Sequence, residues 1–330
     1  QGYTHILFAV GAWKPGKLDI AGDVAGAIQW MKGVKAGNIS VAGNIAVIGG
    51  GNTAMDVART MRRMGAEPLV VYRRTRDKAP AHDAEIAEAI EEGVTMKWLS
   101  TVKEASEGEI KIEKMVLDVN GKPQPTGEFE TIAADSLVLA LGQQTDLGLL
   151  TGVKGLTVEK DEVIVDPVTF MTGADGVFAG GDMIPGDKNV TAAIGHGKKA
   201  ARSINAWLKG EVYQPEKAAP PASFERLHTW YYADAPKTVR PMLDLVRRQT
   251  TFDEVQRGLT EENALFEARR CMSCGNCFEC DNCYGVCPDN AVIKLGAGMK
   301  FRFNYEYCKG CGICANECPC GAIDMVSEDV

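Results

Sequence analysis

The sequence predicts an α/β protein in which a parallel-stranded region is followed by a small C-terminal α+β domain. Residues 44–72 hold a β-branched run, a glycine-rich turn, a helical pattern and a second apolar run, which is the order of a βαβ unit. All eleven cysteines lie between Cys271 and Cys320, so thiol chemistry is confined to the C-terminal region. The length of 330 residues suits two or three domains.

The βαβ unit can be followed residue by residue. Asn44–Ile48 is a short apolar run typical of a buried parallel strand. The helical pattern that follows ends at Gly65, and a second strand begins at Leu69. The apolar positions of the helix share one face, and we expect its arginines to lie outside that face: Arg59, Arg62 and Arg63.

The turn between strand and helix fits the pattern G-x-G-x-x-A, which in this context is the fingerprint of a Rossmann-like dinucleotide domain. Gly49 permits the tight turn, and Gly51 lets a pyrophosphate reach the backbone. The helix N-terminus at Asn52 and Thr53 offers free N–H donors and the positive end of the helix dipole. A plain loop is the alternative, and the strand–turn–helix order argues against it.

The end of the second strand indicates which nucleotide is used. An acidic residue there would bind the ribose hydroxyls of NAD, whereas an arginine accommodates the 2′-phosphate of NADP. Arg73 and Arg74 stand at this point, so we predict that NADP(H) is preferred over NAD(H). A solvated basic turn is the alternative, since some NAD-using enzymes tolerate one.

Eight of the cysteines form one motif, C-x2-C-x2-C-x3-C-P, written twice, once from Cys277 and once from Cys308. This is the signature of bacterial two-cluster ferredoxins, in which the fourth cysteine of each copy ligates the other copy's cluster. Gly310 and Gly312 are expected to let the backbone approach the inorganic sulfurs. The predicted [4Fe-4S] ligands are Cys277, Cys280, Cys283 and Cys318 for the first cluster, and Cys308, Cys311, Cys314 and Cys287 for the second.

Other uses of these cysteines fit less well. Structural zinc is usually held by two separated cysteine pairs, and a disulfide framework would leave the whole chain before Cys271 without a crosslink. Cys271 and Cys274 extend the two-residue rhythm upstream and allow a second reading frame for the first site. We prefer the frame that ends in Cys-Pro because its twin does too. The roles of Cys271, Cys274 and Cys320 stay open.

Further pieces fit a second nucleotide domain. Val177–Asp182 has the pattern of a strand that ends in Gly181-Asp182, and a helix begins soon afterwards near Thr191 and Ala192. The runs Ile6–Gly11 and Leu137–Gly142 are apolar strands that end on glycine.

These residues carry a family resemblance. Residues 1 to about 210 resemble the flavoprotein disulfide reductase superfamily, most closely the glutamate synthase small-subunit branch, on the residues around Gly49 to Ala54, Tyr72 to Arg74 and Asp182. The resemblance implies a Rossmann-like NAD(P)H domain inserted in an FAD-binding domain. It places Asp182 near the flavin ribityl and phosphates, and it implies contacts to the cofactors from Gly11, Gly142, Gly181, Thr191 and Ala192.

Residues 271–325 resemble a different family, the ferredoxin-type delta subunit of 2-oxoacid:acceptor oxidoreductases. The match rests on Tyr305, Tyr307, the run Cys308–Cys314 and the following Cys318-Pro319. Together the two resemblances suggest an NAD(P)H-reactive module of a larger redox complex.

The resemblance also predicts the domain boundaries. The FAD fingerprint of the superfamily should precede residue 1, so we expect either a fragment of a longer protein or a partner that supplies that half. The predicted order is part of the FAD domain in residues 1–40, the NAD(P)H domain in 41–145, the FAD return segment in 146–210, a linker and helical bridge in 211–265 and the 2[4Fe-4S] ferredoxin domain in 266–330.

Composition narrows the possible partners. The formal net charge of −8 makes nucleic acid an unsuitable partner, and no apolar run approaches the length of a membrane span. Densely packed thiols suit a reducing compartment, so we expect a cytoplasmic protein.

The four histidines are scattered, and only His196, near the second helix start, merits a test. No catalytic nucleophile set is apparent, and the C-x-x-C of disulfide reductases is absent from the flavin half.

We therefore expect an electron-transfer oxidoreductase subunit that uses NAD(P)H, FAD and two [4Fe-4S] clusters. Its expected partners are pyridine nucleotide and either other subunits of a redox complex or a ferredoxin-type donor or acceptor. One alternative is a glutamate synthase small subunit that feeds an amidotransferase. The other is a non-catalytic electron-wire subunit. The direction of electron flow stays open.

Overall fold

The computed structural model describes residues 4–16, 18, 20, 24–215 and 221–327. They form two compact units, and each draws on two stretches of the chain. The first unit combines residues 1–215 with 243–255, and the second combines 216–242 with 256–330. Residues 216–220 of the expected linker lie outside the described part of the chain.

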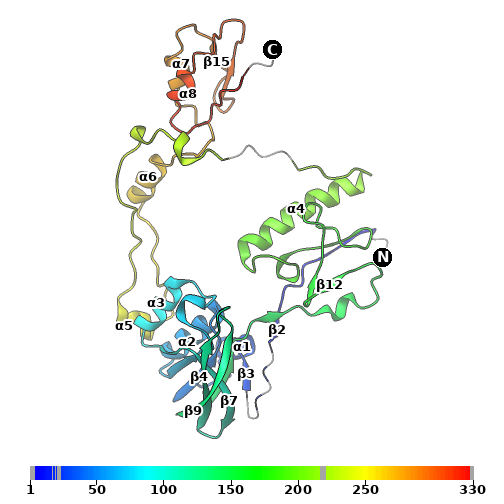
Figure 1. The fold of residues 1–330 in the computed structure, drawn as a ribbon, viewed down its shortest axis with the longest axis vertical. Coiled ribbons are helices and arrows are strands. Elements are labelled where there is room, and N and C mark those ends of the chain that lie inside the picture. The colour runs from blue at the N-terminus through cyan, green and yellow to red at the C-terminus, as the bar shows by residue number, and fades with distance from the viewer. Residues whose placement is uncertain (1–3, 17, 19, 21–23, 216–220, 328–330) are drawn as a thin grey trace. The chain divides into compact units, whose positions relative to one another are not determined.

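A five-stranded parallel sheet is the centre of the first unit (Figure 1). In spatial order the strands are β3 (Val24–Gly26), β10 (Ser136–Leu139), β4 (Asn44–Ile48), β5 (Glu67–Val71) and β6 (Thr95–Lys97). The register pairs Ile45 of β4 with Pro68 of β5, and Ile48 with Val71. The strand–turn–helix–strand order predicted from the sequence is therefore present, with its two strands side by side.

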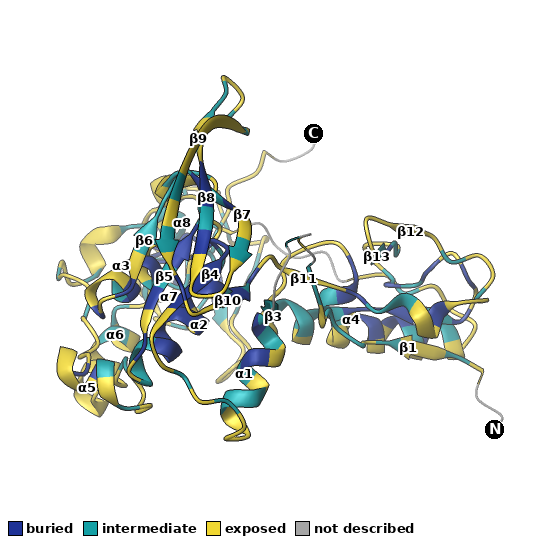
Figure 2. Cartoon of the chain, turned by 90° about the horizontal axis from the view of Figure 1, so that it is seen from below, coloured by how far each residue is buried: buried dark blue, intermediate teal, exposed yellow. Residues whose placement is uncertain are grey.

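The two faces of this sheet are covered by different layers. Alternate residues of β4 point to opposite faces, so Ile45 and Val47 pack under the helices while Ala46 and Ile48 pack against a second sheet. Figure 2 shows β4, β5 and α2 largely in the colour of buried residues. The helices of the first layer are α1 (Ala27–Lys35), α2 (Asn52–Arg63) and α3 (Asp83–Glu91).

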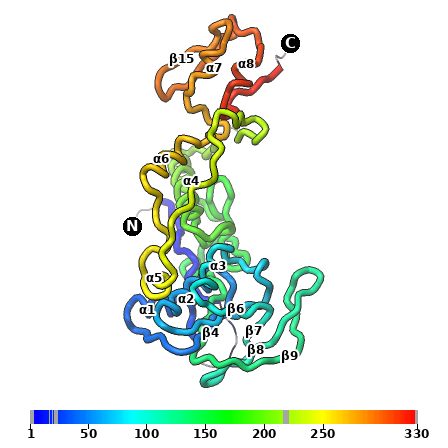
Figure 3. The backbone as a smooth tube through the Cα atoms, turned by 90° about the vertical axis from the view of Figure 1, so that its left-hand side faces the viewer, coloured from blue at the N-terminus to red at the C-terminus, as the bar shows by residue number. Residues whose placement is uncertain are grey.

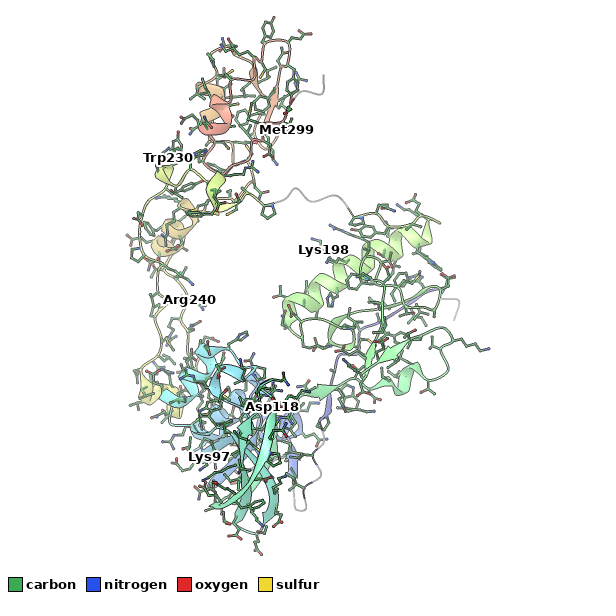
Figure 4. The ribbon with its side chains drawn as sticks, in the orientation of Figure 1. Lys97, Asp118, Lys198, Trp230, Arg240 and Met299 are labelled. Atoms are coloured by element: carbon green, nitrogen blue, oxygen red, sulfur yellow. The ribbon has the colours of Figure 1, made fainter. Side chains whose placement is uncertain are left out.

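The second layer is an antiparallel three-stranded sheet. Asp118, labelled in Figure 4, accepts the backbone N–H groups of Asn120 and Lys122 at 2.8 and 2.9 Å and so stabilises the turn between its last two strands. Lys97, also labelled, pairs with Glu130 at 2.8 Å. The strands are β7 (Ser100–Ser106), β8 (Glu109–Leu117) and β9 (Pro123–Ala133).

The predicted boundary at residue 40 separates elements that pack together in the structure. Strand β3 pairs with β10, and Ala27 and Trp30 of α1 share a hydrophobic core with β4, so residues 24–35 pack with the five-stranded sheet. Short apolar strands look alike in both domains, and only the pairing partner tells them apart. The two connecting strands β2 (Lys14–Pro15) and β11 (Gln143–Gln144) pair antiparallel, and Lys14 binds Asp146 at 2.7 Å.

The remaining part of the first unit is built on the strand pair β1 (Ile6–Phe8) and β14 (Val177–Ala179), which run parallel. Helix α4 (Val190–Leu208) begins after Asn189, whose side chain accepts the N–H of Ala192 at 2.8 Å. A small core around Phe170, Ala179 and Met183 holds these elements together. The pair β12 (Val158–Glu159) and β13 (Glu162–Val163) completes this part.

The second unit contains the cysteines. Helix α6 (Glu261–Arg269) precedes them and is capped by Thr260, which accepts the N–H of Asn263 at 3.2 Å. Figure 4 labels Trp230 on one side of this unit and Met299 in the turn between its two strands. Its further elements are α7 (Asn282–Gly285), β15 (Val292–Lys294), β16 (Phe301–Phe303) and α8 (Ile313–Asn316).

Helix α5 (Leu245–Thr250) was expected in the bridge between domains, but it packs on α2 and α3 of the nucleotide domain (Figure 3). Arg59 was expected on the outside of α2 and is also buried. The reason in both cases is Glu92, which is completely buried directly after α3.

The carboxylate of Glu92 is surrounded by guanidinium groups. Arg59 binds both of its oxygens at 2.9 and 2.7 Å, and Arg248 of α5 donates to Oε1 at 3.1 Å. Arg63 lies 3.6 Å from Oε2 and donates to the backbone oxygen of Arg248 at 2.9 Å. Burial by itself raises the pKa of Glu92, but the hydrogen bonds and charges of these arginines outweigh burial and lower the pKa overall. The carboxylate is therefore ionised at neutral pH.

We predict that Glu92→Gln lowers the free energy of unfolding of the first unit by about 3–5 kcal/mol, because it removes the buried carboxylate that three guanidinium groups share. Arg59 and Arg248 then keep only partners that are more exposed, such as Glu85 and Glu91. Urea unfolding at pH 7 measures this loss. Because the folded pKa of Glu92 is depressed, the stabilisation is complete above the ordinary glutamate pKa of about 4.3. The advantage of the wild type over the variant should shrink as the pH falls through the folded pKa.

The matched control is Glu91→Gln. Glu91 binds Arg248 at 2.7 Å, but its side chain is 60% exposed. Because the carboxylate of Glu91 lies largely in water and Arg248 keeps Glu92 as its partner, this variant should lose about 1 kcal/mol or less. Equal losses in the two variants would contradict the central role of Glu92.

Candidate functional site

The glycine turn lies between β4 and α2, and two of its glycines are enforced by packing. Gly49 has φ +149°, and a Cβ there would stand 2.3 Å from the carbonyl oxygen of Ala140. A Cβ on Gly50 would meet the ring of Tyr72 at 2.5 Å, a requirement that the G-x-G-x-x-A pattern does not state. Ala140 follows β10 and Tyr72 follows β5, so the ends of these two strands leave no room for a side chain at Gly49 or Gly50.

The third glycine has a different environment. A Cβ on Gly51 would meet nothing closer than Pro80 at 3.9 Å, so the backbone here is open to a close approach from outside. Gly51 is also the N-cap of α2 and adds no side chain of its own to the helix end. Asn52 begins α2 and accepts the N–H of His82 at 3.0 Å, and Thr53 lines a small cavity together with Gly142. The structure thus brings to one end of the sheet Gly49, Gly51, Asn52, Thr53 and Gly142.

Arg73 and Arg74 follow directly after β5. Arg73 is exposed and Arg74 is half-buried. Within the part of the chain that the structure describes, neither guanidinium has a hydrogen-bond or ion-pair partner, and Nε of Arg74 is buried without one. A buried cationic N–H without an acceptor is costly, so this turn is suited to binding an anion.

The residues expected at the flavin site fall into two groups. Gly11, Gly181 and Asp182 line one cavity of about 200 Å³, together with Ala193 and Gly197 of α4. Thr191 and Ala192 lie in the first turn of α4 and do not line this cavity. The side chain of Asp182 has no partner among the described residues, so its carboxylate is available to a ligand hydroxyl.

His196 takes part in shaping this cavity. Its Nδ1 accepts the backbone N–H of Gly181 at 3.3 Å, and its ring packs on Phe170 with centroids 5.2 Å apart. Gly197 lines the cavity but was not predicted from the sequence. The sequence did hold a signal for it. Gly197 follows Ala193 by one helical turn, and two small residues at i and i+4 leave room for a cavity beside that face of the helix.

The four cysteines predicted for the second cluster line a single cavity of about 640 Å³. Cys287 comes from the first copy of the motif, and the others come from the loop before α8 and from α8 itself. The thiol of Cys287 accepts the N–H of Ala291 at 3.2 Å, and hydrogen bonds from backbone N–H groups lower its pKa although burial opposes them. A thiolate with N–H donors is a suitable ligand for an iron–sulfur cluster.

The four cysteines predicted for the first cluster also lie together. Burial raises the pKa of the Cys283 thiol to about 11, and the nearby thiols of Cys277, Cys280 and Cys318 act in the same direction. Cys318 belongs to the second copy of the motif and lies among the thiols that act on Cys283. Among the described residues, no three metal-binding side chains converge on one point as ligands of a single ion do.

The two copies share their backbone as well as their spacing. Helix α7 occupies the same place in the first copy that α8 occupies in the second. Gly310 and Gly312 have φ +68° and +76°, and the equivalent Glu279 and Asp281 adopt +62° and +69°. The left-handed conformation is costly for these two side chains, so the loop geometry is imposed on the first copy without glycine. Nothing in the local sequence marks Glu279 and Asp281 for this conformation.

Comparison with known proteins agrees with this geometry. The profile of the pyridine nucleotide-disulphide oxidoreductase family matches residues 1–197, and that of the 4Fe-4S binding domain matches residues 301–324. The fold is similar to that of thioredoxin reductase from Lactococcus lactis, with a TM-score of 0.52 and 25% identity over 62% of this chain and 66% of that one.

Two curated relatives align with different shares of this chain. The beta subunit of the NADP(+)-dependent formate dehydrogenase of Moorella thermoacetica is 31% identical over 83% of this chain and 43% of its own length. The small chain of the glutamate synthase [NADPH] of Azospirillum brasilense is 36% identical over 56% of this chain and 41% of its own length.

The chain thus spans less than half the length of these two relatives. Among the described residues, no helix combines the length and the apolar character needed to cross a membrane. The family match covers more than half of the sequence and includes the glycine turn and Asp182. The chain therefore belongs to the pyridine nucleotide-disulphide oxidoreductase family and carries a 4Fe-4S binding domain near its C-terminus.

Proposed function

We propose that this chain is an electron-transfer module that binds NADP(H), FAD and two [4Fe-4S] clusters and works within a larger redox complex. The observation that carries the proposal is the gathering of Cys287, Cys308, Cys311 and Cys314 around one cavity, in a chain that also has an open glycine turn at a helix N-terminus. A nucleotide site and an electron-carrying site in one chain require a two-electron to one-electron conversion.

The nucleotide is held at the β4–α2 turn under this proposal. The N–H groups of the first turn of α2 and the open backbone at Gly51 would receive the pyrophosphate. Arg73 and Arg74 would bind the 2′-phosphate, because their guanidinium groups have no other partner among the described residues. The names of the two relatives include NADP(+) and NADPH, which supports the same choice.

The flavin would be held near the cavity of Gly11, Gly181 and Asp182. The carboxylate of Asp182 would accept hydrogen bonds from ribityl hydroxyls, and the bare backbone at Gly181 would allow a phosphate to approach. His196 keeps the Gly181 turn in place by accepting its N–H group. When bound, the flavin accepts a hydride from nicotinamide and releases electrons singly.

The cysteine sets would each hold one cluster, and a bound cluster carries one electron at a time. This chain supplies four thiolates for each, left-handed loop residues that keep the ligand loops short, and N–H donors such as those of Ala291 and Ala322. These donors stabilise negative charge on the sulfur of Cys287 and Cys318.

The partner proposed for the module is another subunit of a redox complex or a ferredoxin-type donor or acceptor. The name of the Moorella relative describes a subunit of a formate dehydrogenase, which supports a complex of this kind. A second candidate is a glutamate synthase small subunit, favoured by the Azospirillum relative at 36% identity. The first candidate is favoured because the Moorella match covers 83% of this chain and the Azospirillum match only 56%.

We predict that Arg73→Ala weakens NADPH binding about tenfold to a hundredfold and leaves NADH binding nearly unchanged, because only NADPH has the 2′-phosphate. Fluorescence or calorimetric titration measures the affinity for both nucleotides. Lys78→Ala is the matched control, since Lys78 lies in the same turn but already pairs with Asp77 at 3.3 Å. Equal losses for NADPH and NADH would refute the NADP assignment.

We predict that Cys311→Ala removes one of two iron–sulfur signals and stops electron delivery to a one-electron acceptor, while nucleotide binding survives. The iron content per chain and the EPR spectrum of dithionite-reduced protein measure the loss. The test is completed by anaerobic titration of the wild type with NADPH, which should bleach the flavin and reduce the clusters. Clusters that only dithionite reduces would favour the electron-wire alternative.

A further inference from the structure

The two copies of the motif differ at two positions next to the ligands that face each other at the second site. At the second site, Lys309 follows Cys308, and Asp289 follows Cys287-Pro288. The equivalent residues at the first site are Phe278, which follows Cys277, and Cys320, which follows Cys318-Pro319. An ion pair at one site is thus replaced by a ring and a thiol at the other.

The ion pair joins the two loops that supply the ligands of the second set. Nζ of Lys309 lies 3.1 Å from both carboxylate oxygens of Asp289. Lys309 also lines the cavity of the second set, and its charge is felt by Cys311 and Cys287. The cation at the edge of the second site thus stands beside its own counter-ion, and Asp324 also lines the cavity.

The first site is neutral at these positions and more deeply buried. Cys320 is only 2% exposed, and its Sγ lies 3.8 Å from Sγ of Cys318. In the first set Cys283 and Cys318 are buried, whereas none of the four cysteines of the second set is.

A segment before the cysteines adds to this burial. The backbone N–H of His228 donates to the carbonyl of Pro319 at 3.2 Å, and the hydroxyl of Tyr232 donates to the carbonyl of Met272 at 3.3 Å. Tyr232 lies close enough to Cys320, Cys280 and Cys318 to feel their charges. The described residues place no such segment over the cavity of the second set, whose lining comes from residues 287–327 alone.

We infer that the two clusters have different reduction potentials, that the second cluster is the easier to reduce, and that the Lys309–Asp289 pair tunes its potential. The inference rests on the proposed function, in which both cysteine sets hold [4Fe-4S] clusters. Reduction adds one negative charge to a cluster. That charge is more costly in the more deeply buried first site than in the more exposed second site, where the ammonium of Lys309 lies close to the ligands.

The inference sets the order in which the clusters fill. The first electron that enters the pair settles on the second cluster, and the first cluster is reduced only at lower potential. Electrons therefore pass downhill from the first cluster to the second, and a one-electron acceptor is served from the second. One cysteine of each set is exposed, Cys280 and Cys311, so exposure of a ligand does not by itself choose the exit.

The test is an anaerobic potentiometric titration of the full chain followed by EPR. Cys311→Ala identifies the signal of the second cluster, because that signal is lost in the variant. The wild type should show two midpoint potentials, the higher one belonging to the second cluster. Two equal potentials, or the reverse order, would overturn the inference.

Two variants test the ion pair with opposite signs. Lys309→Gln leaves the carboxylate of Asp289 unpaired and should lower the ratio of reduced to oxidised second cluster at a fixed potential roughly threefold or more. Asp289→Asn leaves the ammonium unpaired and should raise the same ratio. A tenfold change corresponds to about 59 mV for one electron. Because Lys309 is 58% exposed, both shifts should shrink at high ionic strength.

Lys294→Gln is the matched control. Lys294 also belongs to an ion pair of this unit, with Asp281 at 2.7 Å, but its electrostatic neighbours are Asp281 and Tyr284. It should leave the potential of the second cluster unchanged. An equal shift in this control, or shifts of the same sign in the two ion-pair variants, would refute the tuning role.

The same experiment separates this inference from the proposed function. If dithionite-reduced wild type gives fewer than two cluster signals, the proposed function fails and the inference fails with it. If two signals appear but titrate together, the proposed function stands and the inference alone is overturned.

Discussion

The buried carboxylate of Glu92 is the constraint on which the nucleotide domain depends. A buried charge must be matched, and here the matching groups come from α2 and from α5, which lies far along the chain from both α2 and α3. Arg59 and Arg63 fix the C-terminal half of α2 against the end of α3. The N-terminal end of the same helix lies at the glycine turn, so the ion network and the proposed nucleotide site share one rigid element.

The strongest local patterns predicted the fold best. The β4–turn–α2–β5 unit could be read from the sequence because strand, glycine turn and helix follow one another without interruption between Asn44 and Val71. The placement of β3 and α1 could not be predicted from the sequence, because a strand as short as Val24–Gly26 does not reveal its pairing partner. The burial of Arg59 could not be read either, since its partner Glu92 lies outside the helix and its position depends on α3.

The candidate site divides in the same way. Cysteine spacing predicted which thiols would gather, including the crossing of Cys318 into the first set, since the two copies of the motif have identical spacing. The packing demand of Tyr72 on Gly50 and the left-handed backbone of Glu279 were out of reach. They depend on how loops meet in space, and no local pattern records such contacts. The start of α4 shows the same limit, because the sequence placed the helix correctly but the face that borders the cavity belongs to Ala193 and Gly197.

The return of residues 243–255 to the first unit has a consequence for a divided chain. Cleavage at one point between residues 221 and 242 would cut the backbone within the first stretch of the second unit, before α5. The C-terminal fragment would still carry α5 close to its start, and Arg248 of α5 binds Glu92 and Glu91 of the other fragment. The two pieces would therefore remain associated without a peptide bond between them.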